Sequence, residues 1–207
     1  MFGEPVVDSS TIALYKCNGN GKDVTGNYDL NNVNTPVYTD FRFGKGLAMS
    51  GSANYLKTTS FPKLISLGTF SIEAWVRLNN NTDKVKALIG WNKVSDTGST
   101  AFLLQQNTAA LRCYVNGGYR MTFTFQVGKI YYMVITYNHT DTFWSWYVNG
   151  ALQTTHNGGN GLNQTQTEFS IGYGYNGNPN ATISSVHVTQ RLMKDSEIRN
   201  KYNQLKQ

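Results

Sequence analysis

Short runs in which apolar and polar side chains alternate recur along almost the whole chain, and they most limit what it can fold into. In the clearest run, residues 69–78, every second side chain is apolar and shares one face: Phe70, Ile72, Ala74, Val76 and Leu78. Period-two alternation is typical of a half-buried β-strand. Clusters of Gly and Asn, which favour turns, separate the runs. The pattern predicts an all-β sandwich or barrel.

The composition agrees with this fold class. The 207 residues include 23 Asn, 22 Thr, 20 Gly, 4 Trp, 13 Tyr and 10 Phe. Aromatic residues and Thr favour strands, while Asn and Gly favour turns. No Pro-rich, Ser-rich or single-charge linker divides the sequence, so we expect one domain over residues 1–207.

Twelve further strands are predicted from the same pattern. They are Ile12–Lys16, Leu47–Ser50, Tyr55–Thr58, Val85–Trp91, Ala101–Gln106, Leu111–Val115, Tyr119–Phe125, Ile130–Tyr137, Phe143–Val148, Leu152–His156, Glu168–Gly172 and Ile183–Thr189. Asn149-Gly150 and Asn116-Gly117 follow such runs and predict tight hairpins, because both turn residues need positive φ. Residues 195–205 predict one short C-terminal α-helix. Its apolar stripe of Ile198, Tyr202 and Leu205 is expected to pack against the sandwich, so that the helix forms a strap across it.

Two classes of partner are disfavoured. No apolar stretch approaches the roughly 18 residues of a membrane helix, so no membrane insertion is expected. The net charge is +6 and the pI about 9.2, but Lys and Arg are scattered, and the densest set, in residues 191–206, is interleaved with acids. Nucleic-acid binding usually needs a focused basic patch, so it is not expected.

The order of several motifs resembles the laminin-G-like and pentraxin-like branch of the concanavalin A-like lectin/glucanase superfamily. The motifs are Ile12–Tyr15 with the loop 18–27, Gly46–Leu56, Thr69–Val76, Trp146–Gly150, Phe169–Gly172, Ile183–Val188 and Asp195–Ile198. The resemblance implies a jelly-roll sandwich of two curved antiparallel sheets. It covers nearly the whole chain and indicates fold more strongly than function, because this fold serves many functions.

No enzyme is expected. Glycoside hydrolysis needs two carboxylates flanking the scissile bond. The only acids two residues apart are Asp195 and Glu197, at the start of the predicted helix, and Glu73 stands alone on its strand. The three histidines have no nucleophile motif nearby, so a Ser-His-acid triad is equally unsupported.

A calcium site is implied by the resemblance, but its acids are missing. The matching positions are Asn18, Asn54 and the pair Ser184–Ser185, with only Asp23 left in the first loop. Calcium prefers several carboxylates. Two interpretations stay open: a weak site at Asn18, Asp23 and Asn54, or a loop held by side-chain hydrogen bonds without metal. No other cofactor is expected.

The two cysteines leave a similar choice. Cys17 and Cys113 could form one bridge, or they could be two buried thiols, which we favour because Cys packs as a small hydrophobe.

Aromatic residues give the better binding signal. Trp144 and Trp146 share one face of a strand and Phe143, Ser145 and Tyr147 the other, so one of the two sets is displayed. We expect Trp75 to line the sheet face opposite the core, and at least one Trp to be partly exposed. The candidate carbohydrate- or partner-binding residues are Trp75, Trp91, Trp144, Trp146, Tyr119, Arg120, Tyr173 and Tyr175. Core packing is the alternative for each Trp, and the loop of residues 156–161 is a second candidate for recognition.

Three functional hypotheses follow. The first is a structural or adhesion protein of a virus particle, such as a bacteriophage head decoration, fibre or tail component. Its partners would be other virion proteins or copies of itself, and host surface glycans. We expect this because the chain starts at Met1 without an export signal and is rich in Asn and Thr. The alternatives are a secreted carbohydrate-binding lectin and a laminin-G-like protein–protein adhesion module.

Overall fold

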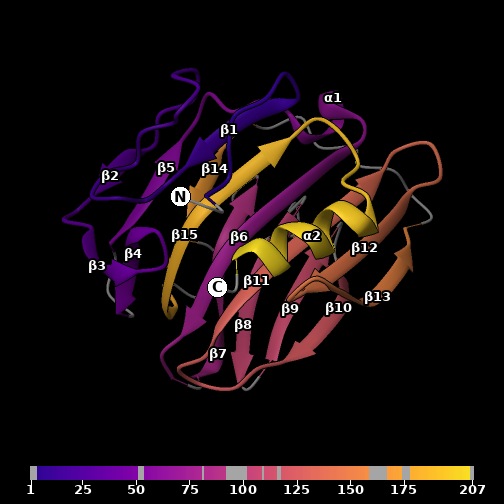
Figure 1. Cartoon of the computed structure of the whole chain (residues 1–207). Coiled ribbons are helices and arrows are strands. Elements are labelled where there is room, and N and C mark those ends of the chain that lie inside the picture. The colour runs from indigo at the N-terminus through magenta and orange to yellow at the C-terminus, as the bar shows by residue number, and fades with distance from the viewer. Residues whose placement is uncertain are drawn as a thin grey trace.

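Two antiparallel sheets packed face to face form the molecule (Figure 1). The computed structural model describes residues 4–50, 54–80, 82–91, 102–108, 110–115, 118–158, 167–173 and 178–205. Every pair of neighbouring strands in the described part runs antiparallel. The predicted fold class, a two-sheet antiparallel β-sandwich with a C-terminal helix, is confirmed.

The first sheet has the strand order β13-β12-β11-β6-β15-β4-β3, and β1 also pairs with β15. Its strands are β1 (Thr11–Tyr15), β3 (Val37–Phe41), β4 (Gly44–Ser50), β6 (Phe70–Leu78), β11 (Ile130–Asn138), β12 (Phe143–Val148), β13 (Ala151–Asn157) and β15 (Asn180–Thr189). The second sheet has the order β10-β9-β8-β7-β14-β5-β2. Its strands are β2 (Asn31–Val33), β5 (Tyr55–Thr58), β7 (Thr82–Trp91), β8 (Phe102–Thr108), β9 (Ala110–Val115), β10 (Gly118–Thr124) and β14 (Phe169–Ile171).

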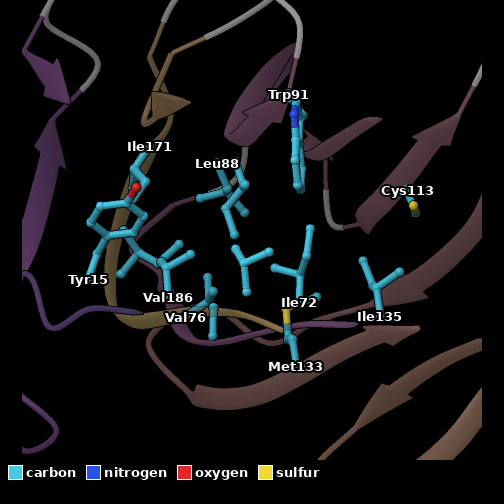
Figure 2. Close-up of a cluster of buried hydrophobic side chains, with 14 of the residues drawn as sticks. Tyr15, Ile72, Val76, Leu88, Trp91, Cys113, Met133, Ile135, Ile171 and Val186 are labelled. Atoms are coloured by element: carbon cyan, nitrogen blue, oxygen red, sulfur yellow. The ribbon is translucent and has the colours of Figure 1, made fainter. Parts of the chain in front are cut away.

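The core lies between the sheets and receives the alternate side chains that the sequence pattern predicts. The five apolar side chains of β6 are all buried there. Figure 2 shows Ile72 of this strand near Met133 and Ile135 of β11, and Val76 near Val186 of β15, with Trp91 and Leu88 from the second sheet. Burial of these side chains from both sheets supplies the main driving force for the sandwich.

The outer face of the first sheet carries a second apolar cluster, which the helix α2 (Asp195–Leu205) covers. Trp75, Tyr132, Val134, Tyr147, Met193 and Ile198 form this cluster. Figure 1 shows α2, in yellow, lying across this sheet. The predicted strap is therefore confirmed, and it explains why β11 is apolar on both faces.

The sequence pattern missed three elements. The strands β2 and β3 lie at the edges of their sheets, and most of their residues are exposed or half-buried, so they lack a strongly apolar face. The third is the single helical turn α1 (Leu64–Leu67). The predicted Asn149-Gly150 turn is confirmed, with φ of 51° and 78°. Asn116-Gly117 lies outside the described residues, although β9 and β10 on either side of it pair.

The two cysteines are both free and buried, which confirms the interpretation as separate thiols. Burial raises the pKa of Cys17 to about 12. None of the described helices is both long and apolar enough to cross a bilayer.

Candidate functional site

Three of the four tryptophans proposed for binding lie in the core between the sheets. Trp91, Trp144 and Trp146 are all fully or almost fully buried. The indole of Trp91 donates a hydrogen bond from Nε1 to the carbonyl oxygen of Pro62 at 3.0 Å. On β12 the face with the indoles turns inward, and Phe143, 38% exposed, lies on the opposite face. These three rings therefore follow the alternative kept for each Trp, which is packing in the core.

Trp75 faces away from that core, as predicted, but it is only 2% exposed. Its ring packs against Tyr132, with centroids 5.1 Å apart, and against Tyr202 of α2 at 6.5 Å. The guanidinium carbon of Arg42 lies 4.5 Å from the ring centroid on the indole. Helix and turn together cover the ring, so none of the four Trp is partly exposed in this structure.

Among the predicted binding residues whose side chains the structure describes, Tyr173 is the one that is partly exposed. Its ring stacks on that of Tyr55, with centroids 4.1 Å apart and planes 15° from parallel. Tyr55 belongs to β5 and Tyr173 follows β14, and these strands are neighbours in the second sheet. Lys57 of β5 and Ser170 of β14, paired in register, extend the same outer face. We call Tyr55 and Tyr173 the tyrosine ledge.

Several hydrogen bonds hold the backbone under the ledge. The buried amide of Asn178 donates from Nδ2 to the carbonyl oxygens of Gly172, at 2.6 Å, and Asn54, at 3.1 Å. Ser170 Oγ donates to the carbonyl oxygen of Tyr173 at 3.0 Å. Gly172 has φ of +87°, a conformation that residues with a side chain rarely adopt. These hydrogen bonds thus fix the backbone at Gly172 and Tyr173.

Sequence reasoning missed Tyr55 and Asn178, which build the ledge with Tyr173. Tyr55 alternates with the buried Leu56, so its outward direction was readable from the strand pattern. The hydrogen bond between Asn178 and Asn54 joins residues 124 positions apart, so no local sequence pattern could indicate it.

The remaining predicted binding residues are less fully described. Tyr119 and Arg120 lie on β10, with side chains outside the described part. Tyr175 lies outside the described residues, as do residues 159–161 of the predicted recognition loop.

Asp23, the one acid predicted for calcium, instead organises its loop. Its Oδ1 accepts hydrogen bonds from the backbone N–H groups of Leu14 and Thr25, at 2.9 and 3.0 Å. Its Oδ2 accepts from the Thr25 hydroxyl at 2.5 Å and from the N–H groups of Asn27 and Tyr28 at 3.2 and 3.0 Å. Five donors occupy a carboxylate with about four lone-pair sites. Hydrogen bonds of the Asp23 side chain thus hold the loop, as in one of the two interpretations that the sequence left open.

The other two predicted ligands have partners of their own. Asn18 Oδ1 accepts a hydrogen bond from the Lys45 backbone N–H at 3.2 Å. The backbone carbonyl oxygen of Asn54 accepts one from Asn178 Nδ2. In the described part of the chain, no three His, Cys, Asp or Glu side chains lie together as a metal site would require.

A buried polar network lies under α2 on the outer face of the first sheet. Glu73 of β6 is 1% exposed and His187 of β15 is 2% exposed. Glu73 Oε1 lies 2.7 Å from His187 Nδ1 and 2.8 Å from Lys201 Nζ, and its Oε2 accepts a hydrogen bond from the Tyr132 hydroxyl. His187 Nε2 contacts Thr11 Oγ1 at 3.0 Å.

This environment sets the ionisation of the network. Burial alone would raise the pKa of Glu73, but the hydrogen bond with His187 and the charge of Lys201 outweigh it and lower the pKa to about 2. Burial and the Glu73 charge raise the pKa of the Tyr132 hydroxyl well above its ordinary value. Glu73 is therefore a permanent anion at neutral pH, and it anchors Lys201 of the helix.

A cavity of about 350 Å³ opens beside this network, between the N-terminal segment and α2. Its charged lining residues are Glu4, Asp8, Arg191, Glu197 and Lys201. Arg191 holds Glu197 through two hydrogen bonds of 2.6 and 2.5 Å, Glu4 pairs with Lys16, and Lys201 pairs with Glu73. Every charged side chain that lines the cavity is thus already held in an ion pair, Asp8 through Arg191 at 3.8 Å, which does not favour a charged ligand.

Comparison with known proteins identifies the fold. Residues 50–199 match the family model described as the concanavalin A-like lectin/glucanases superfamily. No curated protein sequence matches the chain.

Several solved structures share the fold. A Trypanosoma rangeli sialidase in complex with sialic acid superposes with a TM-score of 0.73 at 18% identity, over 97% of this chain and 35% of the sialidase. The chain thus spans about a third of that enzyme. The binding domain of botulinum neurotoxin serotype D gives 0.72 at 14% identity, over 94% of this chain and 51% of that one. Domain 4 of an extracellular GH43 arabinanase from Geobacillus stearothermophilus, in complex with arabinotriose, superposes with a TM-score of 0.70 at 14% identity. The match covers 93% of this chain and 98% of that domain.

Proposed function

The chain belongs to the concanavalin A-like lectin/glucanase superfamily, and from this we propose that it is a non-enzymatic module that binds glycans. Two of the similar structures support the proposal: the arabinanase domain was solved with arabinotriose, and the neurotoxin domain is a binding domain. Since these structures are less than 20% identical to the chain, the choice of ligand has to come from the residues themselves.

The tyrosine ledge carries the proposal. A sugar ring can stack on a flat aromatic ring while its hydroxyls bond to polar neighbours, and a Tyr side chain offers both an apolar face and a polar end. Tyr173 is partly exposed, its ring packs on that of Tyr55, and the half-buried Lys57 lies on the same outer face. Asn178 and Ser170 hold the carbonyl oxygens of Gly172 and Tyr173, so little backbone freedom at these two residues is lost on binding.

The carboxylates support a module without catalysis. Glycosidases place two carboxylates about 5–9.5 Å apart across an accessible bond. Glu73 is enclosed by Tyr132, His187 and Lys201, and Glu197 is held by Arg191. Both carboxylates serve structural contacts.

Affinity electrophoresis in gels containing arabinan, xylan or mannan tests the proposal. We expect at least one polysaccharide to retard the native chain, and Tyr173→Ala to abolish the retardation. Phe143→Ala is the matched control, because it also removes an exposed ring, but from the first sheet. Equal retardation of both variants, or no retardation of the native chain, would contradict the proposal.

We further propose that the module works in a virus particle, as a bacteriophage head decoration, fibre or tail component that contacts host glycans. Support comes from the Asn- and Thr-rich sequence, which fits an AT-rich genome, and from a fold suited to adhesion. Detection of the chain by mass spectrometry in purified particles would support this role. Its recovery as a freely exported lectin would instead favour the secreted alternative.

A further inference from the structure

Two arginines lie against aromatic rings at the outer face of the first sheet: Arg42 in the turn between β3 and β4, and Arg77 on β6. The guanidinium carbon of Arg42 lies 4.5 Å from the Trp75 ring centroid and 5.5 Å from that of Phe43. The guanidinium carbon of Arg77 lies 5.4 Å from the Phe41 ring centroid. Trp75 and Arg77 are two residues apart on β6, so their side chains share a face. We call Arg42, Arg77 and Trp75, with Ser184, the arginine cluster.

Neither guanidinium of the cluster is paired with a carboxylate among the residues that the structure describes. Arg77 donates to two neutral oxygens, from Nε to Asn79 Oδ1 at 3.1 Å and from Nη2 to Thr182 Oγ1 at 3.3 Å. Arg191, in contrast, is neutralised by Glu197. The cluster therefore keeps two positive charges without a fixed counter-ion.

Buried donors at the same place have no acceptor. Trp75 Nε1, Ser184 Oγ and Arg42 Nε are buried and lack a hydrogen-bond partner within the described part of the chain. Trp75 of β6 and Ser184 of β15 are partners in the strand register, so these atoms belong to one locality. Unpaired buried donors cost stability, and such groups in native structures usually have a partner or a function.

We propose that the arginine cluster binds an oxyanion, the carboxylate or sulfate group of an acidic saccharide. Guanidinium groups match the planar geometry of such anions and bond to them strongly. An anion at this place would take donors from Arg42 and Arg77, while the Phe41 and Phe43 rings offer apolar surface to the sugar. The net charge of +6 attracts such a ligand at long range.

Access to the indole donor depends on Arg42. Its half-buried side chain rests on Trp75 through a cation–π contact, and its Nε has no hydrogen-bond partner in the described part of the chain to hold it there. When Arg42 moves off the indole to meet the anion, Trp75 Nε1 becomes available as a further donor. The saccharide nature of the ligand rests on the proposed function, but the site lies on the other sheet from the tyrosine ledge.

Isothermal titration tests the proposal with hyaluronan fragments, which carry carboxylates, and chondroitin sulfate fragments, which also carry sulfates. We expect Arg42→Gln and Arg77→Gln each to weaken binding about tenfold, as loss of one charge-assisted hydrogen bond would. Arg199→Gln removes the same charge from an exposed position of α2 and should change affinity less than about twofold. Melting temperatures check folding, and Arg42→Lys, which keeps the charge but not the planar fork, should bind with intermediate affinity.

The outcomes separate this site from the ledge. The Tyr173→Ala variant should bind the acidic fragments as tightly as the native chain does. If the neutral polysaccharides fail to bind while the acidic fragments bind and need Arg42, the ledge proposal fails and this one stands. Equal weakening by all three Arg-to-Gln variants would show general charge attraction and overturn the site. Poly-glutamate bound as tightly as the saccharides would overturn the saccharide class.

Discussion

His187 Nδ1 lies 2.7 Å from Glu73 Oε1, although 114 residues separate the two in the sequence. The register of β6 with β15 places them side by side, and Lys201 of α2 reaches the same oxygen at 2.8 Å. One buried carboxylate thus ties the central strands of the first sheet to the helix that covers them. The tyrosine ledge and the arginine cluster do not include Glu73, His187 or Lys201. Loss of the Glu73 carboxylate is therefore expected to lower stability more than glycan binding.

Glu73→Gln should lower the free energy of unfolding by about 2–3 kcal/mol, the upper part of the range for hydrogen bonds to charged groups. The amide keeps the shape of the carboxylate but leaves Lys201 and His187 without their anion. Urea unfolding followed by circular dichroism measures the change. Asp141→Asn is the control, because that carboxylate is exposed and contacts only Asn138 among the hydrogen bonds resolved for it. A change below about 0.5 kcal/mol in both variants would show that the network does not stabilise the fold.

Acid should weaken the fold partly through the same carboxylate. Burial opposes ionisation of Glu73, but His187 and Lys201 lower its pKa from 4.5 to about 2. The unfolded chain therefore takes up this proton at a higher pH than the folded chain. The stabilisation is fully present above about pH 5 and is lost as the pH falls from about 4.5 towards 2.

Urea midpoints at pH 7 and pH 3 isolate this effect when the native chain is compared with Glu73→Gln. The native chain should lose more stability on acidification than the variant, because Asp8, Asp29 and Glu197, whose pKa values are also lowered by hydrogen bonds, remain in both. Parallel losses would mean that Glu73 is not the depressed group.

Strand alternation made most of the sandwich predictable, because burial between two sheets demands it residue by residue. The β6 stripe and the Asn149-Gly150 turn are local patterns and were confirmed. Which face of β12 points into the core was not predictable in the same way. Both of its faces are aromatic, and only the position of the second sheet decides that Trp144 and Trp146 turn inward.

The candidate sites were less predictable because they join distant segments. Glu73 was noted as a lone acid within an apolar strand, and a buried charge needs partners, but nothing local identified His187 and Lys201. Trp75 was correctly assigned to the outer face. Its cover by Tyr202 and Arg42 depends on where a helix and a turn pack, which period-two alternation does not encode.

Asp23→Ala should destabilise the chain by about 1–3 kcal/mol, because five donors lose their acceptor at a site that is nearly buried. EDTA should leave the melting temperature of the native chain unchanged, since the carboxylate is already occupied by the loop. Differential scanning fluorimetry with EDTA and with millimolar calcium measures both effects. A clear drop with EDTA that is absent in the variant would restore the calcium interpretation for Asp23, Asn18 and Asn54.

Acrylamide should quench the fluorescence of the native chain weakly, because all four Trp are buried, and strongly after unfolding in urea. Trp75 differs from the others in being covered by α2 rather than by the second sheet. Ile198→Asp puts a charge into the buried face of that helix and should release it, making about a quarter of the Trp emission accessible while the core stays closed. Asn200→Asp adds the same charge at an exposed position of α2 and should leave quenching unchanged. Strong quenching of the native chain, or an equal response in both variants, would show that α2 does not cover the outer face of the first sheet in solution.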